Sequence, residues 1–342
     1  METSWSVILG HKNQVGRLRK LLKSDKLPHA MLFTGASGIG KSLVAEVLAA
    51  SILCQSEGDV ACGICQSCRA FKASTHPDFH RLVPMTKDEW DGKKEKSRTA
   101  KRIIRLEQLK KMQADIAMVP ALSPLSVVVI ESAETMNQEA ANSLLKTIEE
   151  PDGPVVFILT TAFPAALLDT VISRCMRMEF GVLSHQDVEE LLRRQGVDTD
   201  RSALLAALSD GSIGDALKLN QDEIIELRKK ALDIVDQMSE YDMDDIWQLG
   251  KELGQLSREQ LSQLLSFQIA VFRDMLVLYS CSDGLALYNQ GDYARLSSLI
   301  EKYSVCRTER LLRLVREAQQ KLRSNVNARL LMEGLFIKMK DV

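Results

Sequence analysis

Short, continuous apolar runs alternate with helix-like segments over the first 180 residues of the chain. The runs lie at 30–34 (AMLFT), 126–130 (SVVVI) and 155–160 (VVFILT), and the last two are rich in β-branched residues. Such runs are typical of strands that are buried on both faces of a parallel sheet. The segments at 41–53 and 137–149 have helical character. This alternation predicts a parallel sheet that is covered by helices.

From about residue 181 onward the strand pattern stops, and leucines recur at helical spacing. Ser184 is suited to cap one helix and Gly196 to end it, and a short helix is expected at 200–208. The rest of the chain is helical in pattern. The expected organisation is an α/β module at 1–180, a small helical lid at 181–220 and an all-α C-terminal domain at 221–342.

Composition and charge narrow the class of protein. The chain has 342 residues, a net charge of −2 and 45% hydrophobic residues, which suits a globular protein of two or three domains. This balanced charge gives no overall attraction to nucleic acid, so any contact with DNA would come from a local patch or a partner. No export signal or membrane-spanning stretch is evident, and a cytoplasmic location is expected. In that reducing compartment, clustered cysteines are more often metal ligands than disulfides.

One motif for phosphate binding is matched in full. It reads Gly35-Ala36-Ser37-Gly38-Ile39-Gly40-Lys41-Ser42 and lies between an expected strand and an expected helix. The glycines let backbone N–H groups turn inward around phosphate oxygens, and the helix adds the positive end of its dipole. Lys41 is expected to reach the outer phosphates, and the Ser42 hydroxyl to ligate Mg²⁺. The P-loop therefore predicts a site for a nucleoside triphosphate, without indicating which reaction follows.

The acidic residues that a hydrolysing P-loop enzyme needs are altered. Glu131 follows the strand at 126–130 and takes the metal-binding position, with one methylene more than the usual Asp. Ser132 takes the position of the general base, and a serine hydroxyl does not accept a proton at neutral pH without help. We interpret Glu134 as a solvated residue at a helix start rather than as a substitute base. The site is predicted to bind nucleotide and to hydrolyse it weakly or not at all.

Four cysteines form a second candidate site. Cys54, Cys62, Cys65 and Cys68 follow the pattern C-x₇-C-x₂-C-x₂-C, in which successive thiolates can turn toward one tetrahedral centre. A redox CxxC pair and buried, unligated cysteines are the alternatives. A redox pair does not need four cysteines, and the polar segment around them is unsuited to a core. We predict structural Zn²⁺, because four protein ligands leave no open position for catalysis.

In order and spacing, several segments resemble the AAA+ subunits of bacterial DNA polymerase III clamp loaders. They are Leu27-Pro28-His29-Ala30, the P-loop, the cysteine cluster, the stretch from Asn137 to Pro151, and Ser173-Arg174-Cys175. The resemblance covers about residues 5–220. It implies an AAA+ module with a helical lid, and a helical collar that joins gamma/tau and delta subunits in a hetero-pentamer. It also implies a task, the ATP-dependent loading of a sliding clamp on primed DNA.

The resemblance also implies roles for single residues. Arg174 corresponds to the family's arginine finger and would reach a neighbour's ATP site, where a cation stabilises charge on the transferring phosphoryl group. An ordinary surface or salt-bridged arginine is the alternative. Thr161 falls near the sensor-1 position and could equally be a threonine at a strand end. Gly214 stands where the ATP-hydrolysing subunits carry the sensor-2 arginine.

These departures favour the stator, delta-prime type of member over the gamma/tau motor type. The intact P-loop points the other way, since many stator chains have an eroded one, so ATP binding stays open. A gamma/tau-type motor ATPase is the first alternative. An unrelated P-loop nucleotide-modifying enzyme is the second, although the sequence offers no further cluster of catalytic acids and bases.

Overall fold

The computed structural model describes residues 3–24, 26–56, 58–92, 102–220, 222–280, 287–289, 292–322 and 326–342. The chain divides into two compact units. The first, here called the α/β unit, comprises Met1–Leu191 and Gly211–Gly214. The second, the helical unit, comprises Leu192–Asp210 and Asp215–Val342. Each unit contains hydrophobic core of its own.

A five-stranded parallel sheet in the order β2-β3-β4-β1-β5 forms the centre of the α/β unit. Its strands are β1 (Ala30–Thr34), β2 (Phe79–Leu82), β3 (Ser126–Ile130), β4 (Val155–Thr161) and β5 (Met176–Glu179). The three predicted strands are confirmed as β1, β3 and β4. The strands β2 and β5 were not predicted, because they lie at the two edges and their sequences, FHRL and MRME, contain charged residues.

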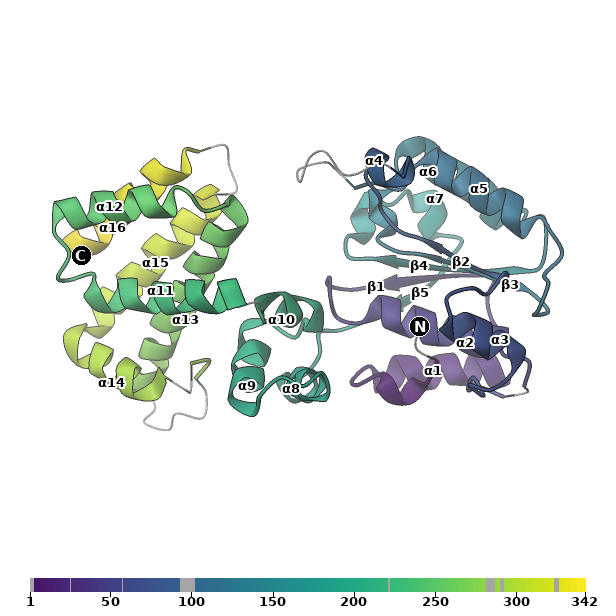
Figure 1. Cartoon of the computed structure of the whole chain (residues 1–342), viewed down its shortest axis with the longest axis horizontal. Helices are drawn as coiled ribbons and strands as arrows, with labels where there is room; N and C mark the ends of the chain where they lie inside the picture. Colours follow the sequence, from purple (N-terminus) through teal and green to yellow (C-terminus); the bar gives the residue numbers. More distant parts are fainter. Residues whose placement is uncertain are drawn as a thin grey trace. The chain divides into compact units, whose positions relative to one another are not determined.

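Helices cover both faces of this sheet (Figure 1). One face carries α1 (Lys12–Lys23), α2 (Lys41–Leu53) and α3 (Gln66–Lys72), and the other carries α5 (Leu106–Ile116), α6 (Gln138–Glu149) and α7 (Asp169–Ile172). The short elements η1 (Trp5–Val7), α4 (Lys87–Trp90), η2 (Ala133–Thr135) and η3 (Pro164–Ala166) complete the unit. Successive residues of a strand face opposite sides, so Phe33 joins the core beneath α2 while Leu32 joins the core beneath α6.

Helices alone make up the described part of the helical unit. They are α9 (Thr199–Leu208), α10 (Ile213–Leu219), α11 (Asp222–Gln237), α12 (Met243–Leu253), α13 (Arg258–Ser280), α14 (Tyr293–Lys302), α15 (Val305–Leu322) and α16 (Ala328–Asp341). Before them, α8 (His185–Arg194) starts within the α/β unit, and the predicted cap is confirmed, since the Ser184 hydroxyl accepts a hydrogen bond from the Asp187 N–H at 3.1 Å. The helix α10 also begins in the α/β unit.

The helix α13 lies at the centre of the helical unit, where it packs against α11, α14 and α15. Length and composition alone would allow this helix to cross a membrane. However, 61% of its apolar stretch is buried within the protein, and the core helix of a soluble protein has the same properties. The burial accounts for its apolar sequence.

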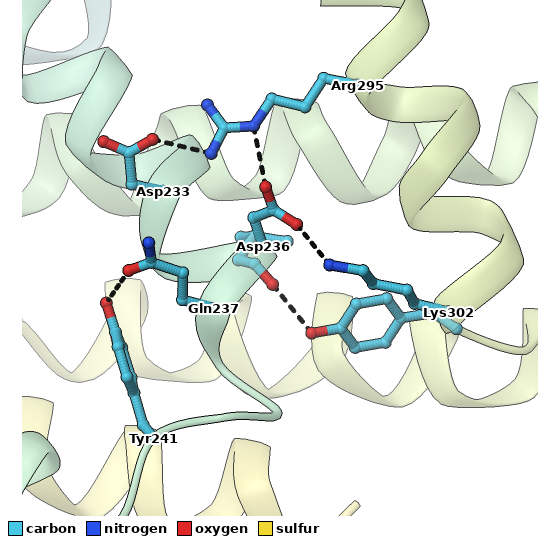
Figure 2. Close-up of polar contacts among 8 residues, drawn as sticks. Asp233, Asp236, Gln237, Tyr241, Arg295 and Lys302 are labelled. Carbon is cyan, nitrogen blue, oxygen red and sulfur yellow. Dashed lines mark hydrogen bonds and ion pairs between the residues drawn. The ribbon is translucent and has the colours of Figure 1, made fainter.

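A polar network joins α11 to α14 (Figure 2). The guanidinium of Arg295 donates to the carboxylates of Asp233 and Asp236 at 2.7 and 3.1 Å. The ammonium of Lys302 donates to the other oxygen of Asp236 at 2.9 Å. Asp236 therefore receives two cations from α14, and it fixes the position of that helix on α11.

We expect Asp236→Asn to destabilise the helical unit in a pH-dependent way. Burial raises the pKa of Asp236, but hydrogen bonds from Lys302 and Arg295 outweigh burial and hold this pKa below its usual value. A carboxyl with a lowered pKa stabilises the fold above its unfolded-state pKa of about 4, and this stabilisation is lost as the pH falls through the folded-state pKa. The substitution should lower the free energy of unfolding by about 1–2 kcal/mol at neutral pH.

Urea unfolding at neutral pH and near pH 3 measures this effect. The difference between the wild type and Asp236→Asn should shrink at the lower pH. A matched control is Glu301→Gln, which removes an exposed carboxylate from the same helix α14. An equal loss of stability at both pH values would contradict the assignment of Asp236.

Candidate nucleotide and metal sites

The P-loop joins the end of β1 to the start of α2, as predicted. Gly35, Gly38 and Gly40 have φ angles of 143°, 73° and 100°, in the region that favours glycine. A Cβ atom at Gly35 would lie only 2.3 Å from the carbonyl oxygen of Phe180. Because the loop follows the end of β1, it lies at the carboxyl ends of the parallel strands, which is where ligands bind in folds of this type.

Lys41 is held over the P-loop itself. Its side chain donates to the carbonyl oxygens of Gly35 and Ala36 at 2.7 and 2.6 Å. Burial lowers the pKa of Lys41, and the nearby charge of Glu134 acts in the opposite direction. The loop thus keeps a cation beside its backbone N–H groups, as binding of a polyphosphate requires. Of the remaining loop residues, Ile39 is fully buried, and its carbonyl oxygen contacts the His11 ring at 2.8 Å.

The structure brings Ser42 and Glu131, the two predicted Mg²⁺ ligands, together. The Ser42 hydroxyl donates to Oε2 of Glu131 at 3.1 Å. Oε1 of the same carboxylate accepts from Nε of Arg81, on the neighbouring strand β2, at 2.6 Å. Serine and glutamate are suitable oxygen donors for Mg²⁺. The residue types therefore fit Mg²⁺, and in this structure the two Glu131 oxygens hydrogen-bond to Ser42 and Arg81.

Glu134 lies in the first turn of a short helix, as expected, but it is half-buried rather than solvated. Its Oε1 atom accepts a hydrogen bond from the Ala162 N–H at 3.2 Å. Its Oε2 atom is buried and has no hydrogen-bond partner among the residues that the structure describes. The short turn η2 after β3 directs this carboxylate toward the end of β4, close enough for its charge to act on Lys41.

Two further residues beside the carboxyl ends of the strands form hydrogen bonds between a backbone N–H and a threonine hydroxyl. Ser132 has a φ angle of 49°, and its N–H donates to the Thr160 hydroxyl at 3.3 Å. The Thr161 side chain is buried at the end of β4, and its hydroxyl accepts from the Phe163 N–H at 3.1 Å. Both of the roles considered for Thr161 place it at a strand end, and the sensor role stays a prediction.

The segment 211–214 lies directly on the P-loop. The Gly214 N–H donates to the Gly38 carbonyl oxygen at 2.9 Å, and the Ser212 hydroxyl donates to that of Ser37 at 3.1 Å. A Cβ atom at position 214 would lie 2.8 Å from Cα of Gly38, which is closer than such atoms approach in proteins. In this arrangement, a side chain at position 214 would require segment 211–214 or the P-loop to shift, and the glycine there allows the close contact.

Arg174 lies near the amino ends of the strands, whereas the chain's own P-loop lies at their carboxyl ends. It precedes β5, whose first residue Met176 pairs with Met31 near the start of β1, whereas the P-loop follows the end of β1. Along the strand direction, the two positions are roughly 13 Å apart. The guanidinium contacts a carboxylate oxygen of Glu149 at 2.5 Å and the Thr170 carbonyl oxygen at 3.0 Å. Both charged side chains are 40% exposed, so Arg174 is accessible to a partner.

The four predicted cysteines converge at the start of α3. Their sulfur atoms all lie within 4.8 Å of one another. A tetrahedral thiolate centre with Zn–S bonds of about 2.3 Å places its sulfurs about 3.8 Å apart. The Sγ atoms of Cys62 and Cys68 are 3.9 Å apart. The cluster can therefore bind a metal ion with little movement.

Backbone hydrogen bonds reach three of the four cysteine sulfurs. Backbone N–H groups of Cys62, Cys65 and Cys68 donate to the sulfurs of Cys54, Cys62 and Cys65, each at 3.3 Å. A hydrogen bond from the Ser56 side chain lowers the pKa of Cys62 to about 5, whereas burial raises that of Cys68 to about 12. Thiolates are the form that binds metal. Four protein ligands would leave no open position on a metal ion bound here.

A P-loop between β1 and α2 of a five-stranded parallel sheet defines the chain as a P-loop α/β protein. A family model described as "DNA polymerase III, delta subunit" matches residues 10–184. The matched region contains the P-loop, the cysteine cluster and Arg174. The chain belongs to this family.

Curated relatives carry related names. The DNA polymerase III subunit delta' of Bacillus subtilis is 28% identical over 95% of this chain and 96% of its own length. The subunit delta' of Pseudomonas aeruginosa is 36% identical over 60% of each chain. The subunit tau of Escherichia coli is 28% identical, but the match covers only 32% of that protein. Among solved structures, a gamma-subunit-related protein of Thermotoga maritima has a TM-score of 0.42 and 14% identity over 96% of this chain and 99% of its own.

Proposed function

We propose that the chain is the delta-prime subunit of a bacterial DNA polymerase III clamp loader. In this role it assembles with gamma/tau and delta subunits into a hetero-pentamer that places the sliding clamp on primed DNA. The family match and the near full-length similarity to the subunit delta' of B. subtilis support the proposal. The division into an AAA+ module (1–180), a lid (181–220) and a collar (221–342) is part of it, as is a cytoplasmic location.

The position of Arg174 carries the proposal. A guanidinium at the amino end of β5 is remote from the chain's own P-loop, which follows the carboxyl end of β1. Its exposed side chain is available to an ATP site on a neighbouring subunit, where a cation stabilises the transferring phosphoryl group. The chain's own site has Ser132 in place of a general base. The chain therefore acts as a stator that lends Arg174 and hydrolyses little ATP itself.

A motor subunit of the gamma/tau type is the second candidate. The P-loop is intact, and Glu134 brings a carboxylate toward Lys41 with one oxygen that has no partner in the described part of the chain. If that oxygen polarised a water molecule, it would replace the missing base at position 132. Turnover by the isolated chain separates the two candidates.

Two measurements on the purified chain test the proposal. Incubated alone with ATP and Mg²⁺, the chain should release phosphate at a rate barely above that of buffer. Mixed with gamma/tau, delta and the sliding clamp, it should elute as a hetero-pentamer whose mass is measured by light scattering. Robust turnover by the chain alone would favour the motor. A failure to assemble would contradict the subunit assignment.

For the cysteine cluster we propose Zn²⁺, which prefers four thiolate ligands at tetrahedral spacing. The sulfurs lie close enough together for such a centre. The metal would hold the segment between α2 and α3, because Cys54 follows the former and Cys65 caps the latter. For the P-loop, ATP is the proposed ligand.

A further inference from the structure

Arg81 forms an ion pair with Glu131, the acidic residue that takes the metal-binding position of the P-loop site. The two oxygens of Glu131 bond to Nε of Arg81 at 2.6 Å and to the Ser42 hydroxyl at 3.1 Å. The Glu131 side chain is 19% exposed and that of Arg81 is 40% exposed, so the carboxylate is partly shielded from water while the guanidinium is not. Arg81 owes its position to the register of β2 beside β3, where it lies opposite Val129, two residues before Glu131.

The charges at this site determine whether it can bind an anionic polyphosphate. A triphosphate is strongly anionic, and an unpaired carboxylate at position 131 would repel it. In a P-loop protein, Mg²⁺ ordinarily offsets this repulsion by bridging the phosphates to the protein's oxygen ligands. Here the guanidinium neutralises Glu131 directly. Lys41 remains as the cation of the loop, held by the carbonyl oxygens of Gly35 and Ala36.

A Mg²⁺ ion at this site would compete with contacts that already exist. It would have to share the two oxygens of Glu131 with the Nε–H group of Arg81 and the Ser42 hydroxyl. Charge-assisted hydrogen bonds of this kind are among the stronger ones in proteins. A guanidinium also carries five N–H donors in a planar fork that suits phosphate oxygens, and its contact with Glu131 uses Nε.

We infer that Arg81 takes the place of the metal ion, so that the P-loop binds the polyphosphate of a nucleotide without Mg²⁺. This inference rests on the proposal that the P-loop holds a nucleotide, and it does not depend on the role of Arg174. It also agrees with a stator, because a site that binds ATP without a metal lacks the ion that activates phosphoryl transfer.

Equilibrium dialysis of radiolabelled ATP against the full-length chain tests the inference. The buffers contain either millimolar Mg²⁺ or no divalent metal, the latter prepared with a chelating resin rather than EDTA, so that the cysteine cluster is not stripped. The wild type should bind ATP with a Kd that changes less than about threefold between the two buffers. Arg81→Ala should bind about tenfold more weakly without metal, the scale of one lost charge-assisted hydrogen bond, and should recover when Mg²⁺ is added.

Two further variants separate charge balance from a general structural effect. The double variant Arg81→Ala with Glu131→Gln should regain metal-free binding, because it removes the carboxylate together with the guanidinium. The matched control is Arg102→Ala, since Arg102 forms an ion pair with Glu89 that does not involve the P-loop residues. This control should bind ATP as the wild type does in both buffers.

Other results of the dialysis experiment would contradict the inference. Wild-type binding that requires Mg²⁺, or metal-free binding that survives Arg81→Ala, would overturn the inference and leave the P-loop as a nucleotide site. An absence of ATP binding by all variants in both buffers would overturn the inference together with the proposed ligand of the P-loop. Near-ultraviolet circular dichroism of each variant identifies any that fails to fold, and Arg81→Lys then provides a milder replacement.

Discussion

Substitution of Arg174 by alanine should slow ATP turnover by the assembled complex while leaving this chain folded. At the ATP site that Arg174 serves, the loss should be about a thousandfold, the lower end of the effect of an arginine finger on kcat. Sites that receive their finger from other subunits would continue to turn over, so the summed rate should fall less. The physical cause is the removal of a cation from the charge that develops on the transferring phosphoryl group.

The fold should tolerate this change because Arg174 is exposed. Its ion pair with Glu149 joins two side chains that are each 40% exposed, and such pairs contribute about 0–1 kcal/mol to stability. Steady-state ATPase assays of the reconstituted complex and thermal unfolding of the isolated chain measure the two effects separately. Arg102→Ala is the matched control for loss of an exposed, ion-paired arginine. Unchanged turnover in a complex that still assembles would remove the finger assignment.

Removal of the metal centre should have the largest effect on the stability of the α/β unit. We expect one Zn²⁺ per chain in the wild type and none after Cys62→Ser and Cys65→Ser together. Metal binding to preorganised thiolates adds directly to the folding free energy, so the loss should be about 3 kcal/mol or more. The segment between α2 and α3 would be affected first, since three of the ligands lie in or next to it.

Metal analysis by mass spectrometry and thermal unfolding measure these outcomes. Cys306→Ser is a matched control, because Cys306 is an exposed cysteine of the helical unit, outside the cluster. Its zinc content and stability should equal those of the wild type. A wild-type chain purified without zinc that neither binds added Zn²⁺ nor gains stability from it would disprove the structural metal.

The parts of the fold that depend on local sequence could be predicted from the sequence alone. The strands β1, β3 and β4 are continuous apolar runs buried on both faces, and the P-loop and cysteine cluster are short motifs with fixed spacing. The edge strands β2 and β5 were not predicted, because their exposed positions carry charged residues and they do not form apolar runs. Local pattern thus identifies the buried strands and leaves the sheet edges undefined.

Several contacts at the nucleotide site join residues that are far apart in the sequence, and no pattern in the sequence predicts these contacts. Arg81 and Glu131 are 50 positions apart and meet only through the register of β2 beside β3. Glu134 was wrongly interpreted as solvated, because the turn that directs its carboxylate toward β4 is a tertiary feature. Gly214 was noted for the arginine that it replaces, whereas its backbone contact with Gly38 became evident only in three dimensions.

The backbone contact between Gly38 and Gly214 has a consequence for substitutions at position 214. The Cβ atom of an arginine there would lie 2.8 Å from Cα of Gly38, so segment 211–214 or the P-loop would have to shift. The shift would act on the hydrogen bond between the Gly214 N–H and the Gly38 carbonyl oxygen. An arginine at this position would therefore change the packing of the segment on the P-loop as well as the charge beside it.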